Sequence, residues 1–304
     1  MNAPRRRLDL ELVRRGLVPS REAARDAVAA GRVTVAGAPA DKASRLVGPG
    51  DPLLVEAGAG WASRGGLKLD AALTRWPVTI EGRRCLDAGA STGGFTDVLL
   101  GRGARQVVSV DVGRGQLLER LRRDPRVVAL DRTNIRTATL ADLGGVAFEV
   151  VVADLSFISL RTVAPRLAGE LAGAGADLVW LVKPQFEAGR DAVARGRGVI
   201  RDPETWRAAV AGVGHALTRA GAAIMGAVSS PVRGAEGNVE FFVWARAHTA
   251  DGLLPDAAAE AAVVDAAAVM GAPGVVGEQA VAVDAPAVVD AADAVDGHNR
   301  DDEP

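Results

Sequence analysis

The sequence has one cysteine, three lysines and no tyrosine among its 304 residues. A single cysteine, Cys85, cannot form an intramolecular disulfide, which excludes a disulfide-stapled secreted scaffold and favours a reducing compartment. No run of 18 or more uncharged apolar residues occurs, so the sequence predicts no membrane-spanning helix. The first thirty residues mix arginines with acidic residues and lack the apolar centre of a signal peptide. We therefore expect a cytoplasmic protein with no membrane partner.

The scarcity of lysine is itself informative. Only Lys42, Lys68 and Lys183 occur, so 33 of the 36 basic residues are arginine, as is typical of a GC-rich genome. Arginine does not release its proton in a protein, whereas a lysine in a suitable site does. A lysine retained in such a chain can therefore mark a position where arginine will not serve. We expect this of Lys68 and Lys183 more than of Lys42.

The net charge of −2 conceals a strong segregation of charge along the chain. Residues 250–304 contain twelve acidic residues and one arginine, which gives −11. The other 249 residues contain 35 basic and 26 acidic residues, which gives +9. A folded part with a net positive charge suits an anionic partner such as nucleic acid. Arginines scattered over a solvated surface would give the same net charge.

Residues 5–56 predict a small α+β unit. Apolar residues recur on one face of two short segments, which predicts helices over residues 8–15 and 21–30. Two β-branched or leucine-rich runs between glycine-containing turns predict strands over residues 32–35 and 53–56. The glycine-rich residues 57–62 are expected to form a linker.

Beyond the linker, β-branched runs alternate with helical patterns. Predicted helices include residues 96–102, 115–122 and 203–220. The predicted strands cover residues 84–87, 107–111, 127–130, 150–153, 178–182, 223–228 and 240–246. This alternation indicates an α/β fold with a doubly wound, Rossmann-like sheet over residues 63–248. Residues 249–304 are rich in Ala, Val, Asp and Gly, and we expect a disordered acidic tail there.

The strongest local motif is the segment Asp-Ala-Gly-Ala-Ser-Thr-Gly-Gly-Phe-Thr, residues 87–96, between a predicted strand and a helix. Small residues let the backbone pass close to a nucleotide, and the start of a helix offers free N–H groups. Asp111 ends the next strand, where a carboxylate can accept both ribose hydroxyls. The spacing is not G-x-G-x-x-G and no Walker lysine follows, which argues against NAD and ATP. S-adenosylmethionine is the favoured ligand, and a tight turn without a ligand is the alternative.

The same segment is compatible with a hydrolase. Residues 89–93 match the G-x-S-x-G nucleophile elbow, with Ser91 as the nucleophile. Such an enzyme also needs a histidine late in its sheet. His215 falls within a predicted helix, His248 borders the tail and His298 lies in the tail. The histidines therefore disfavour the hydrolase interpretation.

A second group of candidates is dispersed in the sequence: Lys68, Asp154, Lys183 and Glu240. Asp154 and Lys183 follow neighbouring predicted strands, where the substrates of α/β proteins bind. Pro184 should end the strand directly after Lys183 and direct that lysine into the site. Each residue alone could be a surface ion-pairing group, but together at strand ends they favour a catalytic site.

These motifs resemble those of the TlyA family, a branch of the FtsJ-like rRNA 2′-O-ribose methyltransferases often called haemolysin A. The resemblance covers about residues 5–247, and residues 5–56 resemble the S4-type RNA-binding domain of that family. The matching segments are residues 63–69, 87–97, 110–112, 131–134, 153–159, 181–187 and 237–242.

The resemblance implies a Rossmann-like, seven-stranded methyltransferase sheet and a K-D-K-E catalytic tetrad of Lys68, Asp154, Lys183 and Glu240. Asp131 stands where the family pattern leads us to expect glutamate, so the side chain at the expected contact with adenosine is shorter. The implied S-adenosylmethionine site comprises Asp87, Gly89, Ser91, Gly93, Gly94, Phe95, Thr96, Asp111, Val112, Asp131 and Asp154.

The implied reaction transfers a methyl group to a ribose 2′-hydroxyl of cytidine in 16S or 23S rRNA, or in both, without a metal ion. Lys183 is the candidate group that takes or steers the hydroxyl proton. Two other functions stay open: an RNA-binding protein with an inactive methyltransferase fold, and a membrane-active haemolysin. Binding of S-adenosylmethionine alone would favour the enzyme over both. The sequence leaves the oligomeric state open.

Overall fold

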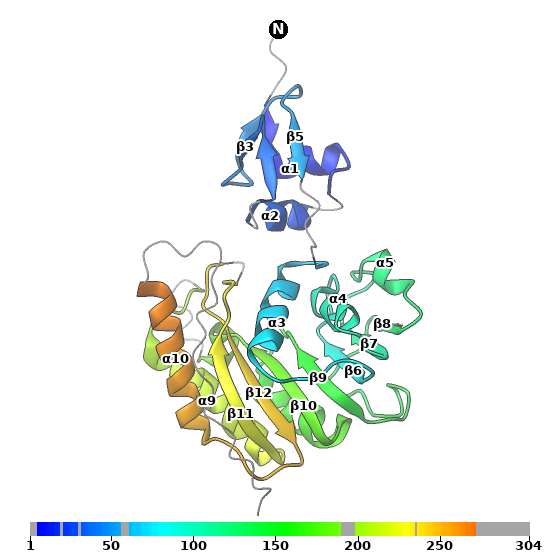
Figure 1. Ribbon diagram of the computed structural model, residues 1–304, viewed down its shortest axis with the longest axis vertical. Coiled ribbons are helices and arrows are strands. Elements are labelled where there is room, and N and C mark those ends of the chain that lie inside the picture. Colours follow the sequence, from blue (N-terminus) through cyan, green and yellow to red (C-terminus); the bar gives the residue numbers. More distant parts are fainter. Residues whose placement is uncertain are drawn as a thin grey trace, which may run out of the picture.

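The computed structural model describes residues 5–18, 21–29, 32–55, 61–189, 198–234 and 236–271. The ribbon shows a small N-terminal unit and a larger unit built on one sheet (Figure 1). In the small unit, α1 (Leu8–Arg14) and α2 (Arg21–Ala29) share a core with Val33, Val35 and Val47. Its strands are β1 (Arg6–Arg7), β2 (Val33–Val35), β3 (Ala38–Pro39), β4 (Leu46–Val47) and β5 (Leu53–Val55).

Both predicted N-terminal helices are present, with ends within one residue of those expected. The predicted strands over residues 32–35 and 53–56 correspond to β2 and β5, which pair antiparallel. Sequence patterning missed β1, β3 and β4, each of which has two residues. Two residues are too few to display the alternation of apolar and polar side chains on which strand prediction depends.

The larger unit contains the seven-stranded sheet that the sequence predicts. Its β12 runs antiparallel to both neighbours, whereas the pairs β10–β9, β9–β6, β6–β7 and β7–β8 are parallel. In spatial order, the strands are β11 (Ala222–Ser229), β12 (Phe241–Ala247), β10 (Ala172–Val182), β9 (Phe148–Ala153), β6 (Arg84–Ala88), β7 (Gln106–Val110) and β8 (Val127–Leu130).

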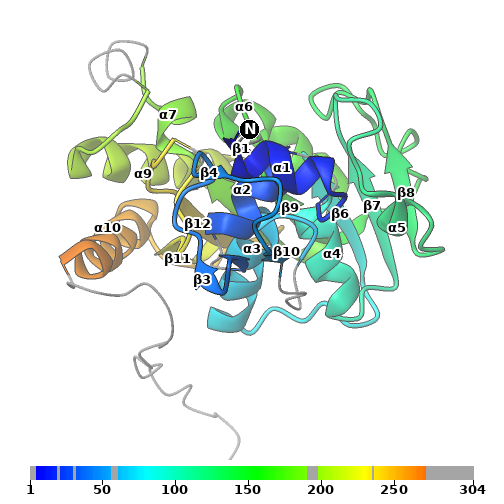
Figure 2. The ribbon, with the colours of Figure 1, turned by 90° about the horizontal axis from the view of Figure 1, so that it is seen from above.

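Helices cover both faces of this sheet (Figure 2). Because successive side chains of a strand point to opposite faces, Val150 and Val152 of β9 enter one core, and Val151 and Ala153 enter the other. The first core includes side chains of α3 (Arg64–Arg75), α4 (Gly94–Gly101) and α5 (Glu119–Arg122). The second includes those of α6 (Leu160–Ala164), the π-helix η1 (Pro165–Leu171), α9 (Pro203–Arg219) and α10 (Pro255–Gly271).

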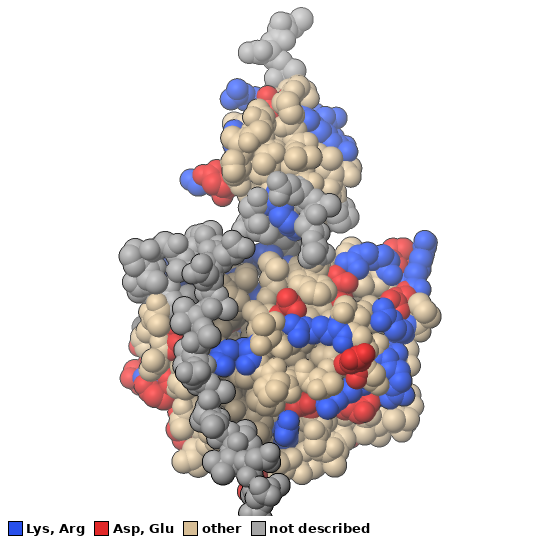
Figure 3. All heavy atoms as spheres, viewed as in Figure 1, with Lys and Arg blue, Asp and Glu red and all other residues tan. Residues whose placement is uncertain are grey.

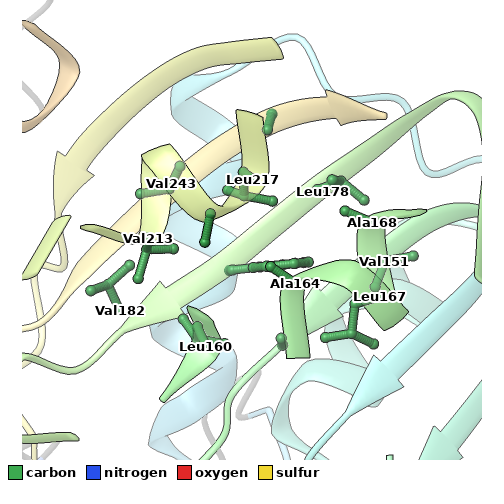
Figure 4. Packing of buried hydrophobic residues seen from close by; sticks show 14 of the residues in the cluster. Val151, Leu160, Ala164, Leu167, Ala168, Leu178, Val182, Val213, Leu217 and Val243 are labelled. Atoms are coloured by element: carbon green, nitrogen blue, oxygen red, sulfur yellow. The ribbon is translucent and has the colours of Figure 1, made fainter. Parts of the chain in front are cut away.

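Figure 4 shows the second core at close range, with Leu160 of α6, Leu178 of β10 and Leu217 of α9 pointing into one apolar layer. Strands buried on both faces are nearly continuous apolar runs, which explains why patterning located them well. The predicted strand over residues 127–130 coincides with β8, and the other six overlap observed strands. The predicted helix over residues 115–122 is shorter than expected. It begins only at Glu119, because Gly115 has a φ of +62° and bonds to Asp131.

The prediction of a disordered tail from residue 249 is wrong for α10. Its residues Ala258, Ala259, Ala262 and Val263 are buried in the second core, against α9 and β11. The Asp265 carboxylate accepts hydrogen bonds from the backbone N–H, at 3.0 Å, and the hydroxyl of Ser229. An alanine-rich segment needs no large side chain to pack closely against another helix. The remainder of the predicted tail, residues 272–304, lies outside the described residues.

Removal of α10 is expected to destabilise the fold. Ending the chain after Thr249 would expose the apolar surface of α9 and β11, so we expect the free energy of unfolding to fall by about 2–5 kcal/mol. Thermal and urea denaturation would measure the loss. A control chain that ends after Gly271 retains α10 and should keep the stability of the full chain. Equal stability of the shorter chain would contradict a structural role for the helix.

Candidate active site

The register of the sheet brings the candidate residues to one edge. The parallel strands β6, β9 and β10 end there, followed by Gly89, Asp154 and Lys183. Strand β12 runs in the opposite direction and therefore begins at this edge, with Phe241 paired to Val182 of β10. Glu240, directly before β12, thus lies beside Lys183 although 57 residues separate them in the sequence.

Two ion pairs join the four residues of the predicted tetrad. Lys183 Nζ lies 2.6 Å from Asp154 Oδ1, and Lys68 Nζ, from α3, lies 2.5 Å from Glu240 Oε2. Lys68 and Glu240 are both buried, at 8% and 2% exposed. The structure therefore places the tetrad as two paired cations and anions, with the Lys68–Glu240 pair the more enclosed.

All four side chains line one cavity of about 250 Å³. The glycine-rich segment and the start of α3 complete its wall, so the cavity lies between the predicted cofactor loop and the tetrad. Among the described residues its lining contains no histidine, which disfavours a hydrolase with Ser91 as the nucleophile. The lining residues other than the tetrad are Ser63, Arg64, Gly65, Gly89, Ala90, Ser91, Thr92, Gly94, Phe95 and Ser156.

A second cavity, of about 490 Å³, adjoins the first. The two cavities share the residues Gly89, Ser91, Asp154 and Ser156, so these form their common wall. The predicted cofactor residues Asp111 and Val112 line the second cavity only. So do Val110, Gln116, Thr133, Asn134, Ile135, Arg136, Leu155, Phe157 and Ile158.

The backbone of the glycine-rich turn has little space for larger residues. Gly89 has a φ of +90°, and a Cβ added there would lie 2.4 Å from the carbonyl oxygen of Asp154. Asp111 holds the turn in place: its Oδ2 accepts from Ser91 N at 2.8 Å, and its Oδ1 accepts from Gly113 N at 2.7 Å. This turn is consequently fixed at the common wall of the two cavities.

Asp87 and Thr96 lie behind the cavities and line neither. The Thr96 hydroxyl donates to Asp87 Oδ2 at 2.6 Å and is 2.7 Å from the Ser109 hydroxyl. Burial raises the pKa of Asp87 to about 7, because a charged carboxylate is poorly solvated there. Its Oδ1 is buried without a hydrogen-bond partner in the described structure.

Two more predicted cofactor residues, Gly93 and Asp131, also line neither cavity. A Cβ on Gly93 would lie 2.3 Å from Leu121 Cδ1, so this glycine is needed for the packing of α5. Asp131 accepts from Gly115 N at 2.9 Å and pairs with Arg122, also at 2.9 Å. These two contacts lower the pKa of Asp131, the backbone hydrogen bond contributing most.

Sequence reasoning missed two residues of the loop after β9, Ser156 and Phe157. Lys183 Nζ donates a hydrogen bond to Ser156 Oγ at 3.0 Å. Phe157 is 91% exposed and has a φ of +64°, unusual for a bulky residue. Its ring centroid is 5.2 Å from that of Phe186, which follows Lys183. An aromatic ring thus stands at the rim of the second cavity, available for stacking.

The N-terminal unit presents arginines held by two buried acids of α1. Asp9 pairs with Arg7 at 3.0 Å and with Arg21 at 3.1 Å, and Glu11 pairs with Arg14 at 2.6 Å. The hydrogen bond from Arg7 contributes most to lowering the pKa of Asp9, to about 2. Figure 3 shows basic groups on both flanks of this unit. Guanidinium groups held in this way, about half exposed, are suited to phosphate contacts.

None of the described helices has the length and apolar character required to cross a bilayer. The family model described as S4 domain matches residues 6–53, and that described as FtsJ-like methyltransferase matches residues 61–247. The fold and the site thus define an FtsJ-like methyltransferase that carries an S4 domain.

Comparison with individual relatives shows which family of FtsJ-like methyltransferases the chain resembles. The 16S/23S rRNA (cytidine-2'-O)-methyltransferase TlyA of Mycobacterium tuberculosis is 50% identical, over 81% of this chain and 92% of that protein. Hemolysin A of Brachyspira hyodysenteriae is 36% identical over 77% of this chain and 97% of that protein. A solved structure from Streptococcus thermophilus, described as a provisional hemolysin, is 35% identical and gives a TM-score of 0.70 over 88% of this chain and 97% of that one. The chain belongs to the TlyA family.

Proposed function

We propose that this protein transfers the methyl group of S-adenosylmethionine to the 2′-hydroxyl of a cytidine in ribosomal RNA. One observation carries the proposal: Lys183 lines the cavity of about 250 Å³ and pairs at 2.6 Å with Asp154, which lies on the wall that this cavity shares with the cavity of about 490 Å³. The 50% identity to an enzyme named for 16S/23S rRNA cytidine-2'-O-methylation supports the substrate and the reaction.

The residues of the site fit S-adenosylmethionine. The cavity of about 490 Å³ is lined by Asp111, whose carboxylate is suited to ribose hydroxyls, and by apolar Val112 and Ile135, which suit an adenine ring. A Cβ at Gly89 would collide with the carbonyl of Asp154, so glycine is needed for the turn to pack this closely at the common wall of the two cavities.

The four side chains of the tetrad have different roles in the methyl transfer. S-adenosylmethionine supplies an electrophilic methyl group bound to a positively charged sulfur. The ribose 2′-oxygen forms the new bond to this carbon as the carbon–sulfur bond breaks, and the hydroxyl proton must leave. Lys183 is positioned to take or steer that proton, and Asp154 holds its amine in place. Lys68 and Glu240, paired with each other, line the same cavity.

RNA affinity is assigned to the N-terminal unit. The arginines paired with Asp9 and Glu11 provide preorganised cationic groups on β1, α1 and α2. The S4 match over residues 6–53 supports the same assignment. We expect this unit to contact phosphates, while the residues around the two cavities select the nucleotide.

The direct test is methylation of ribosomal subunits by the purified protein with S-adenosylmethionine, followed by nuclease digestion and mass spectrometry. We expect 2′-O-methylcytidine to form, and a Lys183→Ala variant to form far less. If S-adenosylmethionine bound but no methylated nucleoside formed on either subunit, the RNA-binding interpretation would replace the enzyme. Leakage of dye-loaded vesicles with no cofactor binding would favour a haemolysin.

Asp111 provides a separate test of the cofactor site. We expect Asp111→Ala to weaken binding of S-adenosylmethionine by roughly 1–3 kcal/mol, because the ribose and the Ser91 turn both lose a charged acceptor. Isothermal titration calorimetry measures the change. Asp131→Asn is the control, since Asp131 lines neither cavity and should retain much more affinity. Equal losses in both variants would contradict the assignment of the ribose to Asp111.

Phe157 tests how the target nucleotide is held. We expect Phe157→Ala to reduce turnover on ribosomal subunits about 5- to 100-fold, since stacking of one base on an aromatic ring contributes about 1–3 kcal/mol. Phe157→Trp keeps an aromatic face and should retain most of the activity. Steady-state rates with varied RNA substrate measure both. If alanine and tryptophan behaved alike, stacking on this ring would not contribute.

A further inference from the structure

The amine of Lys183 has a second polar partner besides its carboxylate. Nζ is 2.6 Å from Asp154 Oδ1 and 3.0 Å from Ser156 Oγ. A lysine ammonium has three N–H donors. The hydrogen bond to Ser156 uses one of them. The contact with Asp154 is an ion pair, and Asp154 Oδ1 has no hydrogen-bond partner in the described structure, so donors remain for a group that enters the cavity. The ion pair holds the charged end of the side chain near Asp154, and the hydrogen bond to Ser156 is the described contact that orients its donors.

Ser156 lies between the two cavities, next to the predicted cofactor loop and the tetrad. It lines both cavities, so the bond to Lys183 lies at their common wall. Its loop is tethered at both ends. Asp154 N donates to the carbonyl of Ala88 in β6 at 3.0 Å. At the far end, Leu160 N donates to the Glu187 carboxylate at 2.7 Å. Ser156 thus lies between two anchored points of the loop.

Glu187 links this loop to the lysine itself. It ends α7 (Pro184–Glu187), the short helix that begins directly after Lys183. Its carboxylate is buried and accepts from the Ser159 hydroxyl at 2.5 Å and from Arg161 Nε at 3.1 Å. The segments that carry Ser156 and Lys183 are therefore tied together, which maintains the contact between the two side chains.

We propose that Ser156 is a positioning residue for the methyl transfer, and that it aims the amine of Lys183 at the incoming 2′-hydroxyl. The proposal rests on the proposed function. A carboxylate such as Asp154 only accepts hydrogen bonds, whereas a serine hydroxyl also donates. Ser156 is therefore able to stay bonded to Lys183 as an ammonium and as a neutral amine. The lysine would keep one orientation through the proton transfer.

Three substitutions separate the hydroxyl from the volume of the side chain. Ser156→Thr keeps a hydroxyl, Ser156→Val has nearly the shape of threonine without it, and Ser156→Ala removes it with little change in volume. We expect turnover on ribosomal subunits to fall roughly 10- to 100-fold in the alanine and valine variants, the loss expected for one hydrogen bond to a charged group. The Ser156→Thr variant should keep most of the turnover of the unaltered chain.

Binding measurements distinguish positioning from cofactor contact. Calorimetry with S-adenosylhomocysteine should give dissociation constants within about 2-fold of the unaltered chain for all three variants, so the effect appears in kcat. Thermal melting checks that each variant folds, and Ser156→Thr keeps the test valid if the alanine variant does not.

Three results would overturn the proposal. Equal turnover of the Ser156→Val and Ser156→Thr variants would show that the hydroxyl is not needed. Full turnover in the alanine variant would show the same. A parallel loss of S-adenosylhomocysteine affinity in the alanine and valine variants would place Ser156 in cofactor binding instead. The unaltered chain is measured beside them: if it forms no 2′-O-methylcytidine, the proposed function fails first, and this inference with it.

Discussion

Lys183→Arg is expected to reduce turnover at least ~10²-fold while leaving cofactor affinity nearly unchanged. The arginine would keep the positive charge beside Asp154, so a purely electrostatic role would survive the change. It would not keep the chemistry, because a guanidinium does not give up its proton at the pH of the reaction. Its planar fork is also too large to place one compact donor between Asp154 and Ser156.

Single-turnover methylation of ribosomal subunits, with calorimetric titration of S-adenosylmethionine, would measure the two quantities separately. Lys42→Arg is the matched control, since the same change at an exposed lysine of the N-terminal unit should have little effect. An arginine variant of Lys183 that kept most of its turnover would reduce this residue to an electrostatic anchor. In that case the hydroxyl proton would have to leave to water.

The sheet could be predicted from the sequence because its signals are local. Strands buried on both faces are continuous apolar runs, and a proline or glycine marks many of their ends. Helix α10 could not be predicted in this way. Its alanines and valines are spread around the helix with few polar residues, so no amphipathic pattern separates Ala262, which is buried, from Val264, which is exposed. Only the packing against α9 and β11 reveals its role.

The site, like the sheet, could be predicted from the sequence only where the signals are local. Strand ends indicated that Asp154 and Lys183 would meet, but the pairing of Lys68 with Glu240 joins residues 172 apart and follows only from the antiparallel entry of β12. A position at a strand end does not give the direction of a side chain. Asp87 therefore satisfied the motif yet turned inward to Thr96. Ser156 carries no charge, and its place in the matching segment 153–159 does not show which residue it contacts, so its distance to Lys183 identifies it.

Glu240→Ala is expected to lower the free energy of unfolding by about 3 kcal/mol, at the lower end of the range of about 3–5 kcal/mol for breaking a buried ion pair. The loss arises because the Lys68 ammonium would be left without its anion at a site where its side chain is 10% exposed. We choose the lower end because the pair lines a cavity, so water can partly solvate the ammonium.

The double variant Lys68→Met with Glu240→Ala distinguishes this cause from a simple loss of packing. It removes the stranded charge together with its partner, so we expect it to be more stable than Glu240→Ala alone, although the same glutamate is missing. Urea denaturation of the unaltered chain, both single variants and the double variant gives the coupling energy. Strict additivity would show that water already screens the two charges and that the pair does not stabilise the fold. Methylation should be lost in the double variant even where stability returns, because the cavity that Lys183 lines would have lost two of its charged side chains.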